Sequence, residues 1–444
     1  GRHGQPLSED IQQAIAHSQM HGPATFPVTA APVDAARWPH TSYPVNRDRL
    51  YDFYTKQADY FRQQHHVPML LAPFPGLDGG QQGHWGNQNE DVWRDGRWND
   101  SALGSVQAGV LHAKGKAFAR AVCVRLGDEA ELSACFNPNK LSYEAVWSDG
   151  FVRFDDVRHG FVGGLKLDGE LVKSRGESPE TRAIAEAVKN GRSKYLGFYR
   201  HGKRVVFSYR IGDVDYLDAP GVKDGKFVRE IAPADQHPLR HLTEGGPTQW
   251  PQTLQTKIIP GGGRPYAVDT IELPFDNPWK VPIFCGGHDF LPDGSALVCT
   301  MQGDVWRVTG LDSGTSKTGV ATWKRFASGL HHALGLIVAD GRIYVQCRAQ
   351  LTRLTDLNND GEADFYECFS NALETSPAGH DFICGLQRDA DGNFYTASGN
   401  QGLLRISADG QTSEILATGF RNPDGLGILS DGVLTLPVSE GEWT

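Results

Sequence analysis

The chain has 444 residues, 39% of them hydrophobic, and its 43 Lys and Arg against 53 Asp and Glu give a net charge of −10. This composition is typical of a globular protein and excludes disorder as the main state. No stretch concentrates Lys and Arg as phosphate neutralisation requires, so we expect no nucleic-acid partner. The longest apolar runs, such as 67–72, are far shorter than the ~20 residues of a membrane helix, so we expect no membrane span.

The N-terminal part is predicted to be an extended arm followed by a helix. Residues 1–47 contain Pro and His without periodicity, and the chain begins at Gly1 without Met, which indicates a processed or trimmed polypeptide. Apolar residues recur at helical spacing over 48–64, and a loop rich in Pro and Gly follows at 73–80. We expect residues 48–275 to form one β-rich domain with a few helices.

Short runs of alternating polarity dominate the chain from about residue 93 to residue 231, and turn residues separate them. This spacing is typical of a sandwich or barrel. One helix interrupts the series, because Ser178-Pro179-Glu180 forms a helix start and Asn190-Gly191 a left-handed stop. We interpret this helix as a surface insertion. The predicted strands are Ala121–Arg125, Glu131–Phe136, Ser142–Trp147, Phe151–Phe154, Tyr195–Tyr199, Arg204–Ile211 and Phe227–Ile231.

The seven cysteines are spaced irregularly and form no Cys-x-x-Cys pair. The chain therefore lacks the motifs of a zinc ribbon and of a covalently bound c-type haem. Cys123 and Cys135 flank a turn at 127–129 almost symmetrically, which predicts that they face each other in a hairpin. The sequence leaves two alternatives open for this pair, a disulfide or two small buried residues.

Residues 276–444 show a repeat. Asp-Gly turns at 292–294, 339–341, 390–392 and 430–432 each lie between two apolar strands, at separations of 47, 51 and 40 residues. A period of this length with paired strands is typical of β-propeller blades, with a second sandwich as the alternative. We therefore predict a mainly β protein, with an N-terminal β-sandwich-like domain followed by part of a β-propeller of about four blades.

Four blades of this length are too few to close most propeller rings. The last repeat stops at Thr444 in the middle of a unit. We expect the remainder of the propeller to come from the same gene product or from a second chain.

Residues 356–367 fit the pattern of a calcium loop, with oxygen-bearing side chains at alternate positions and a glycine at the sixth. No helical pattern flanks the loop, so we expect it to lie between propeller strands. The alternative is an acidic turn that water solvates. The predicted ligands are Asp356, Asn358, Asp360, Glu362, Asp364 and Glu367.

The innermost strands of propeller blades begin at one end of the central channel, so the residues before them converge on one mouth. The residues about ten positions before each Asp-Gly turn are therefore candidates for this mouth. They are Gly329–His332, His380–Phe382 and Arg421–Pro423. His288-Asp289 lies closer to its turn and is a weaker candidate. Imidazole can accept a proton from a hydroxyl, and Arg and Asn bind anionic or carbonyl oxygens. Each of these histidines can also be a hydrogen-bonded structural residue.

The segments around His380, Asp391–Tyr395, Gly399–Gly402, Gly419–Leu426 and Ser439–Gly441 resemble the soluble PQQ-dependent glucose and sorbosone dehydrogenases. The resemblance implies that His380 is the general base and that Arg421 and Asn422 contact the quinone. The resemblance also implies that the calcium ligands of that family come shortly after Ser439–Gly441 and that further cofactor contacts come later still.

The whole chain also resembles large secreted, membrane-bound-dehydrogenase-like proteins of planctomycete-type bacteria, on motifs such as 85–93 and 157–161. These proteins join a domain of unknown function to a propeller, often with a c-type haem domain. The resemblance implies a periplasmic or extracellular sugar or polyol dehydrogenase that passes electrons to a haem partner. The alternative function is a non-catalytic carbohydrate-binding or scaffold protein. Trp85–Asp100 would suit a sugar platform, and buried aromatic residues of a sandwich explain this segment equally well.

Overall fold

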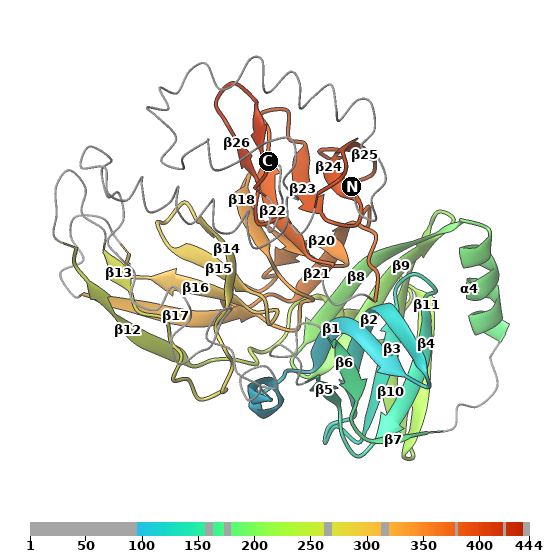
Figure 1. The fold of residues 1–444 in the computed structure, drawn as a ribbon. Helices are drawn as coiled ribbons and strands as arrows, with labels where there is room; N and C mark the ends of the chain where they lie inside the picture. The colour runs from blue at the N-terminus through green and yellow to red at the C-terminus, as the bar shows by residue number, and fades with distance from the viewer. Residues whose placement is uncertain are drawn as a thin grey trace, which may run out of the picture. The chain divides into compact units, whose positions relative to one another are not determined.

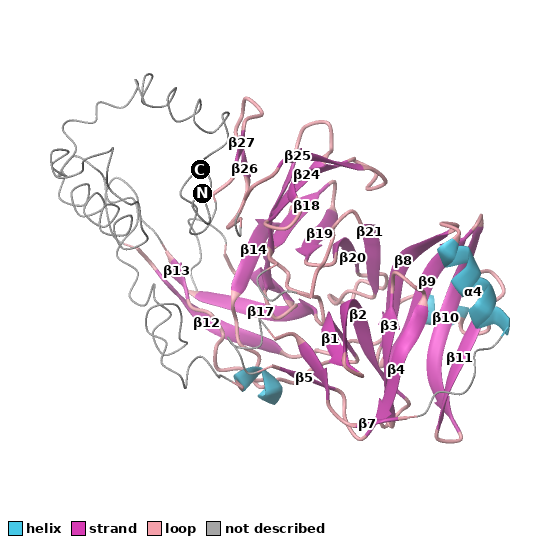
Figure 2. Ribbon diagram, turned by 45° about the vertical axis from the view of Figure 1, so that its right-hand side comes forward, coloured by secondary structure: helices cyan, strands magenta, loops and turns pink. Residues whose placement is uncertain are grey.

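The computed structural model describes residues 96–155, 163–172, 179–261, 269–311, 319–377, 381–420 and 423–437. The predicted arm at 1–47, helix at 48–64 and loop at 73–80 lie outside these residues. Regular structure in the described part is mainly β, as predicted (Figure 2). Two short 3-10 helices, η4 (Arg97–Asp100) and η5 (Arg240–Thr243), lie among the strands. None of the described helices is long and apolar enough to cross a membrane.

The first sheet has seven strands in the order β5-β6-β1-β2-β3-β4-β7. Cys123 on β2 pairs with Cys135 on β3, which confirms the predicted hairpin. Both cysteines are buried and their thiols are free. The strands are β1 (Val106–Ala113), β2 (Lys116–Leu126), β3 (Leu132–Asn137), β4 (Ser142–Ser148), β5 (Val152–Phe154), β6 (Leu165–Leu167) and β7 (Glu170–Leu171).

A second layer packs on this sheet and completes the predicted sandwich-like unit (Figure 1). It consists of β8 (Ser193–His201), β9 (Arg204–Ile211), β10 (Val214–Lys223) and β11 (Lys226–Pro233). The rings of Phe136 and Phe207 stack between the layers with centroids 4.0 Å apart. The predicted surface helix is α4 (Pro179–Lys189), which buries only Ile184.

The predicted repeat forms antiparallel blades in which each Asp-Gly turn joins the first two strands. The first blade contains β14 (Cys285–Phe290), β15 (Ala296–Thr300), β16 (Val305–Thr309) and β17 (Val320–Ala327). The second contains β18 (Gly335–Ala339), β19 (Arg342–Cys347), β20 (Gln350–Thr355) and β21 (Phe365–Ser370). The third contains β22 (Ile383–Arg388), β23 (Phe394–Ser398), β24 (Gly402–Ile406) and β25 (Ser413–Ala417), and β26 (Gly427–Ile428) and β27 (Leu434–Thr435) follow.

Two blades are extended by strands from earlier in the chain. β8 of the sandwich pairs with β21, so the second layer of the sandwich and the second blade form one eight-stranded sheet. β12 (Thr253–Ile259) pairs with β17 and with β13 (Thr270–Ile271), which gives the first blade six strands. The sandwich and the second blade are therefore joined by main-chain hydrogen bonds.

The first strands of consecutive blades lie against one another. β14 contacts β18, β18 contacts β22, and β22 contacts β26 (Figure 1). These are the innermost strands of the blades, so the segments that precede them meet at one end. We call this end the mouth, defined by His331, His332, Arg348, Asp381 and Phe382.

Candidate functional site

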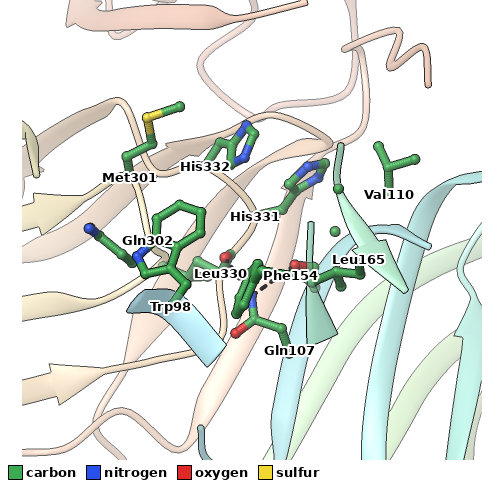
Figure 3. A pocket seen from close by; sticks show the side chains of 13 residues that line it. Trp98, Gln107, Val110, Phe154, Leu165, Met301, Gln302, Leu330, His331 and His332 are labelled. Carbon is green, nitrogen blue, oxygen red and sulfur yellow. Dashed lines mark hydrogen bonds between the residues drawn. The ribbon is translucent and has the colours of Figure 1, made fainter. Parts of the chain in front are cut away.

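The mouth brings together two of the segments that the repeat predicted. The rings of His332, from the loop before β18, and Phe382, from the loop before β22, have centroids 6.0 Å apart. His331 and His332 are neighbours in the same loop, with ring centroids 4.8 Å apart (Figure 3). The main-chain N–H of Arg348 donates to the carbonyl of His331 over 2.8 Å and fixes this loop against the end of β19.

Arg348 and Asp381 form the charged pair of the mouth. Nη2 of Arg348 lies 3.9 Å from Oδ2 of Asp381, and both side chains are almost fully buried. The N–H of Ser376 donates to Oδ2 of Asp381 over 2.9 Å, and Nη2 of Arg348 donates to the carbonyl of Ser376 over 3.2 Å. These bonds fix the carboxylate and the guanidinium beside each other.

The two imidazoles are neutral at physiological pH. Burial lowers the pKa of His331 well below its usual value, and His332 and Arg348 lower it further. Burial, followed by the charge of Arg348, lowers the pKa of His332 to about 3. A general base works best with a pKa near the operating pH. His331 and His332 are therefore suited to hydrogen bonding and not to proton abstraction.

A small cavity lies on the sandwich side of the two histidines, between their loop, Trp98, Gln302 and the strands β1 and β6 (Figure 3). Its volume of about 20 Å³ is enough for roughly one water molecule. A sugar or a cofactor does not fit in this cavity. Phe382, which does not line it, is half-buried.

Several buried polar atoms at the mouth have no hydrogen-bond partner within the described part of the chain. They are Nδ1 of His331, Nε2 of Gln302 and Oδ1 of Asp381. An unpaired buried polar group costs about 1–3 kcal/mol, so such groups normally bind water or a ligand. His331 and Gln302 line the small cavity, where one water molecule would bond to them, so among these three atoms Oδ1 of Asp381 is the candidate contact for a ligand that carries hydroxyls.

The residues predicted to be catalytic or to bind the cofactor, His380, Arg421 and Asn422, lie outside the described residues. Their roles stay predictions. In the chain, Asp381 and Phe382 directly follow His380.

The described residues do not fit PQQ by themselves. The quinone is a tricarboxylate, and buried anions need cations or hydrogen-bond donors beside them. Arg348 is the cation among the defining residues of the mouth, and Asp381 already balances its charge. The described residues of the mouth therefore lack the cations that the three carboxylates would require.

In the loop at 356–367, side-chain oxygens of the predicted calcium ligands accept hydrogen bonds from main-chain N–H groups of the same loop. The N–H of Gly361 donates to Oδ2 of Asp356 over 2.8 Å, and the N–H of Glu362 donates to Oδ1 of Asp360 over 3.0 Å. The N–H of Asp360 donates to Oδ1 of Asn358 over 3.2 Å. Each of these oxygens keeps a further lone pair, so a cation in the loop would be held by Asp356, Asn358 and Asp360.

The other three predicted ligands are occupied by protein groups. Oε1 of Glu362 lies 2.9 Å from Nη2 of Arg200 in a buried ion pair, and Nε of Arg353 donates to Oε2 of Glu367 over 2.5 Å. Both carboxylate oxygens of Asp364 accept main-chain N–H groups, from Gly246 and Leu357. Among the described residues, no group of three or more His, Cys, Asp or Glu is placed to hold a metal ion. Calcium binding at this loop stays a prediction.

Sequence analysis did not identify Arg348 and Gln302 as residues of the site. Arg348 directly follows the apolar strand β19, and its 2% exposure shows that this charge is buried. A charged residue at the end of an apolar strand was the only available signal, and it does not distinguish a buried residue from a solvated one.

Residues 134–218 match the model of a domain of unknown function, DUF6797. This segment runs from β3 to β10 and lies within the sandwich-like unit. No curated protein matches the chain.

Solved structures similar to the chain include the extracellular domain of a protein described as a hybrid two-component system of Bacteroides thetaiotaomicron. The two share 12% identity with a TM-score of 0.27, and the match covers 76% of this chain and 43% of that one. They also include a protein described as an oxidoreductase (glucose dehydrogenase) of Thermus thermophilus, with 14% identity, a TM-score of 0.24 and coverage of 78% and 96%. A third is the extracellular domain of a protein described as a one-component system of B. thetaiotaomicron, with 10% identity, a TM-score of 0.29 and coverage of 72% and 51%. TM-scores this low establish neither a shared fold nor a shared activity.

Proposed function

We propose that the chain is the carbohydrate-binding part of a secreted propeller protein, and that the mouth binds a neutral sugar or polyol. The observation that carries this proposal is the position of the half-buried Phe382 ring directly after Asp381, whose carboxylate lies beside Arg348. An aromatic ring covers the apolar face of a sugar, and a few fixed polar groups give orientation and specificity. A carboxylate accepts hydrogen bonds from hydroxyls, and a guanidinium donates to their oxygens.

His332 supports the same ligand. Its imidazole lies beside the ring of Phe382 and is neutral, so it presents no charge that a neutral sugar would have to compensate. Oδ1 of Asp381, which has no hydrogen-bond partner among the described residues, is the acceptor at which a hydroxyl would bind.

Binding of a sugar panel by the full chain tests the proposal by calorimetry. We expect a neutral sugar or polyol to bind, and we expect Phe382→Ala and Asp381→Asn each to weaken that binding by roughly tenfold. His241→Ala and Asp409→Asn remove exposed side chains outside the mouth and serve as controls. Binding that the controls weaken as much as the mouth variants would contradict the proposal.

Sugar or polyol oxidation is the second candidate, because Asp381 and Phe382 directly follow His380 in the chain. In this function His380 would take the hydroxyl proton of the sugar, and Arg421 and Asn422 would contact PQQ, with calcium as the accompanying ion. A bound quinone would supply the acceptor of the substrate hydride, and a c-type cytochrome domain or partner would receive the electrons. The remainder of the propeller would complete the site.

Dye reduction by the chain after addition of PQQ and Ca²⁺ separates the two functions. Oxidation of a bound sugar that His380→Ala abolishes and His241→Ala preserves would favour the dehydrogenase. Sugar binding without dye reduction would favour the carbohydrate-binding protein.

A further inference from the structure

A second, larger cleft lies away from the mouth, where the sandwich meets the second and third blades. Its lining comes from the β3–β4 turn at 138–139, the start of β8 at 193–195, the end of β21 at 368–371 and the β24–β25 turn at 410–411. We call it the junction cleft. Its volume of about 340 Å³ falls at the small end of the roughly 300–1,000 Å³ that is typical of ligand pockets. The size fits a single sugar unit.

A buried cation without a carboxylate partner lies directly behind the wall of this cleft. Arg120 on β2 is only 9% exposed. Its Nη1 donates to Oδ1 of Asn139 over 2.9 Å, and its Nη2 donates to Oε1 of Gln350 over 2.7 Å and to Sγ of Cys368 over 3.2 Å. All three acceptors are neutral groups, and no acidic side chain among the described residues forms an ion pair with Arg120. Its Nε–H is buried and has no hydrogen-bond partner in that part of the chain.

A second cation lies in the lining itself. Nζ of Lys194 on β8 donates to Oε1 of Gln411 over 2.6 Å, and this bond links the sandwich to the third blade. An ammonium group has three donors, so two remain for a ligand. The lining contains no Asp or Glu, and buried charges are stable only when they are paired or hydrogen-bonded. The exposed carboxylate of Asp409, next to Gly410 in the chain, interacts with Lys194 from outside the lining. The lining itself thus combines the ammonium of Lys194 with the buried guanidinium of Arg120 and no acid of its own, which is complementary to an anion.

The remaining lining residues favour a ligand with hydroxyl groups. Asn371 and Gln411 contribute exposed amides, and Ser370 contributes a hydroxyl. Tyr195 and Phe369 contribute aromatic rings at the base of the cleft. Amides and hydroxyls bind sugar hydroxyls with donors and acceptors alike, whereas a simple inorganic anion would use only the donors.

We propose that the junction cleft binds a monosaccharide unit that carries a carboxylate, such as a hexuronic acid. Lys194 pairs with the carboxylate, the charge of Arg120 stabilises the anion from behind the wall, and the amides of Asn371 and Gln411 bind the ring hydroxyls. The cleft shares no residue with the mouth, so its ligand is independent of the neutral sugar proposed there.

Calorimetry of the full chain with sodium D-glucuronate, D-glucose and sodium acetate tests this proposal at low salt, where charge interactions are least screened. We expect glucuronate to bind roughly tenfold or more tightly than glucose and acetate. Lys194→Met and Asn371→Asp should each weaken glucuronate binding by roughly tenfold or more, because one removes a positive charge and the other adds a negative charge to the cleft. Asn371 is exposed, so its substitution leaves the core intact.

Two controls make the outcomes specific. Lys223→Met removes an exposed lysine at the β10–β11 hairpin and should leave glucuronate binding unchanged, whereas Lys194→Arg should retain most of it. The proposal is overturned if glucuronate does not bind, if glucose binds equally well, if acetate binds equally well, or if Lys223→Met weakens binding as much as Lys194→Met. Asp381→Asn should not change glucuronate binding, which separates this proposal from the one for the mouth.

Discussion

Gly335 on β18 and Gly385 on β22 touch through their main chains: a methyl group on Gly335 would lie 2.9 Å from the carbonyl carbon of Gly385. Such a distance is shorter than normal carbon contacts, which are about 3.5–4.0 Å. The innermost strands of the second and third blades therefore approach as closely as they do because position 335 is glycine. This contact fixes the spacing of the loops that form the mouth.

Gly335→Ala should destabilise the protein by about 1–3 kcal/mol, the usual cost of overpacking, because neither main chain can move without disturbing its sheet. The free energy of unfolding, from urea titration, measures this change. Gly221→Ala is the matched control, since a methyl group there would meet only Val228, at an ordinary 3.7 Å. Equal effects of the two substitutions would show that the close contact does not matter.

The buried histidines predict a loss of stability in acid. The folded-state pKa of His332 is about 3, below the usual value of 6.5, so the unfolded chain binds a proton there that the folded chain does not. Stability from this group is complete above pH 6.5 and is lost as the pH falls from about 6.5 towards 3. His331 acts in the same direction.

His332→Asn should reduce this acid sensitivity, because asparagine does not titrate and tolerates the positive φ of 46° at this position. The slope of unfolding free energy against pH between pH 7 and pH 4 is the measurement. Replacement of the exposed His241 by Asn should leave the slope unchanged. A His332→Asn slope equal to that of the wild type would contradict the assignment.

If the loop at 356–367 binds calcium, calcium should raise the thermal unfolding temperature of the protein, because a ligand that binds the folded state stabilises that state. Asp360→Ala should abolish that increase. Asp409→Ala, in an exposed turn of similar hydrogen bonding, should retain it. An unfolding temperature that responds neither to calcium nor to chelator would rule out the site.

We expect the chain to self-associate through β25, the outer strand of the third blade. All five residues of β25 are exposed, with Ile415 at 53% and Leu416 at 42%, whereas the outer strands of the first two blades are covered by β12 and β8. Exposed apolar edge strands pair with other chains. Ile415→Lys should therefore lower the association measured by sedimentation, and Val228→Lys on β11 provides a control at another exposed position. Association that both substitutions leave unchanged would show that another surface is responsible.

The strands could be predicted from the sequence because alternation and turn residues act locally. The predicted strand at 204–211 coincides with β9, and that at 142–147 lies within β4. The pairing of β8 with β21 could not be predicted, because Phe198 and its partner Tyr366 are far apart in the chain and no local pattern relates them.

The part of the site that follows from the blade repeat could be predicted from the sequence. The repeat brought His332 and Phe382 to one end, as their positions before successive inner strands indicated. The junction cleft was not predictable, because its residues come from turns and strand ends of three separate units. The calcium pattern identified Glu362 as a ligand, but the buried partner Arg200 that occupies its carboxylate is remote in sequence.

The most direct test of the account is a crystal structure of the chain with the neutral sugar or polyol that gives the largest binding heat. We expect the sugar ring to lie against Phe382, with a hydroxyl on Oδ1 of Asp381 and another within hydrogen-bonding distance of Arg348. A sugar bound elsewhere, with His332 and Phe382 still in mutual contact at an empty mouth, would contradict the account.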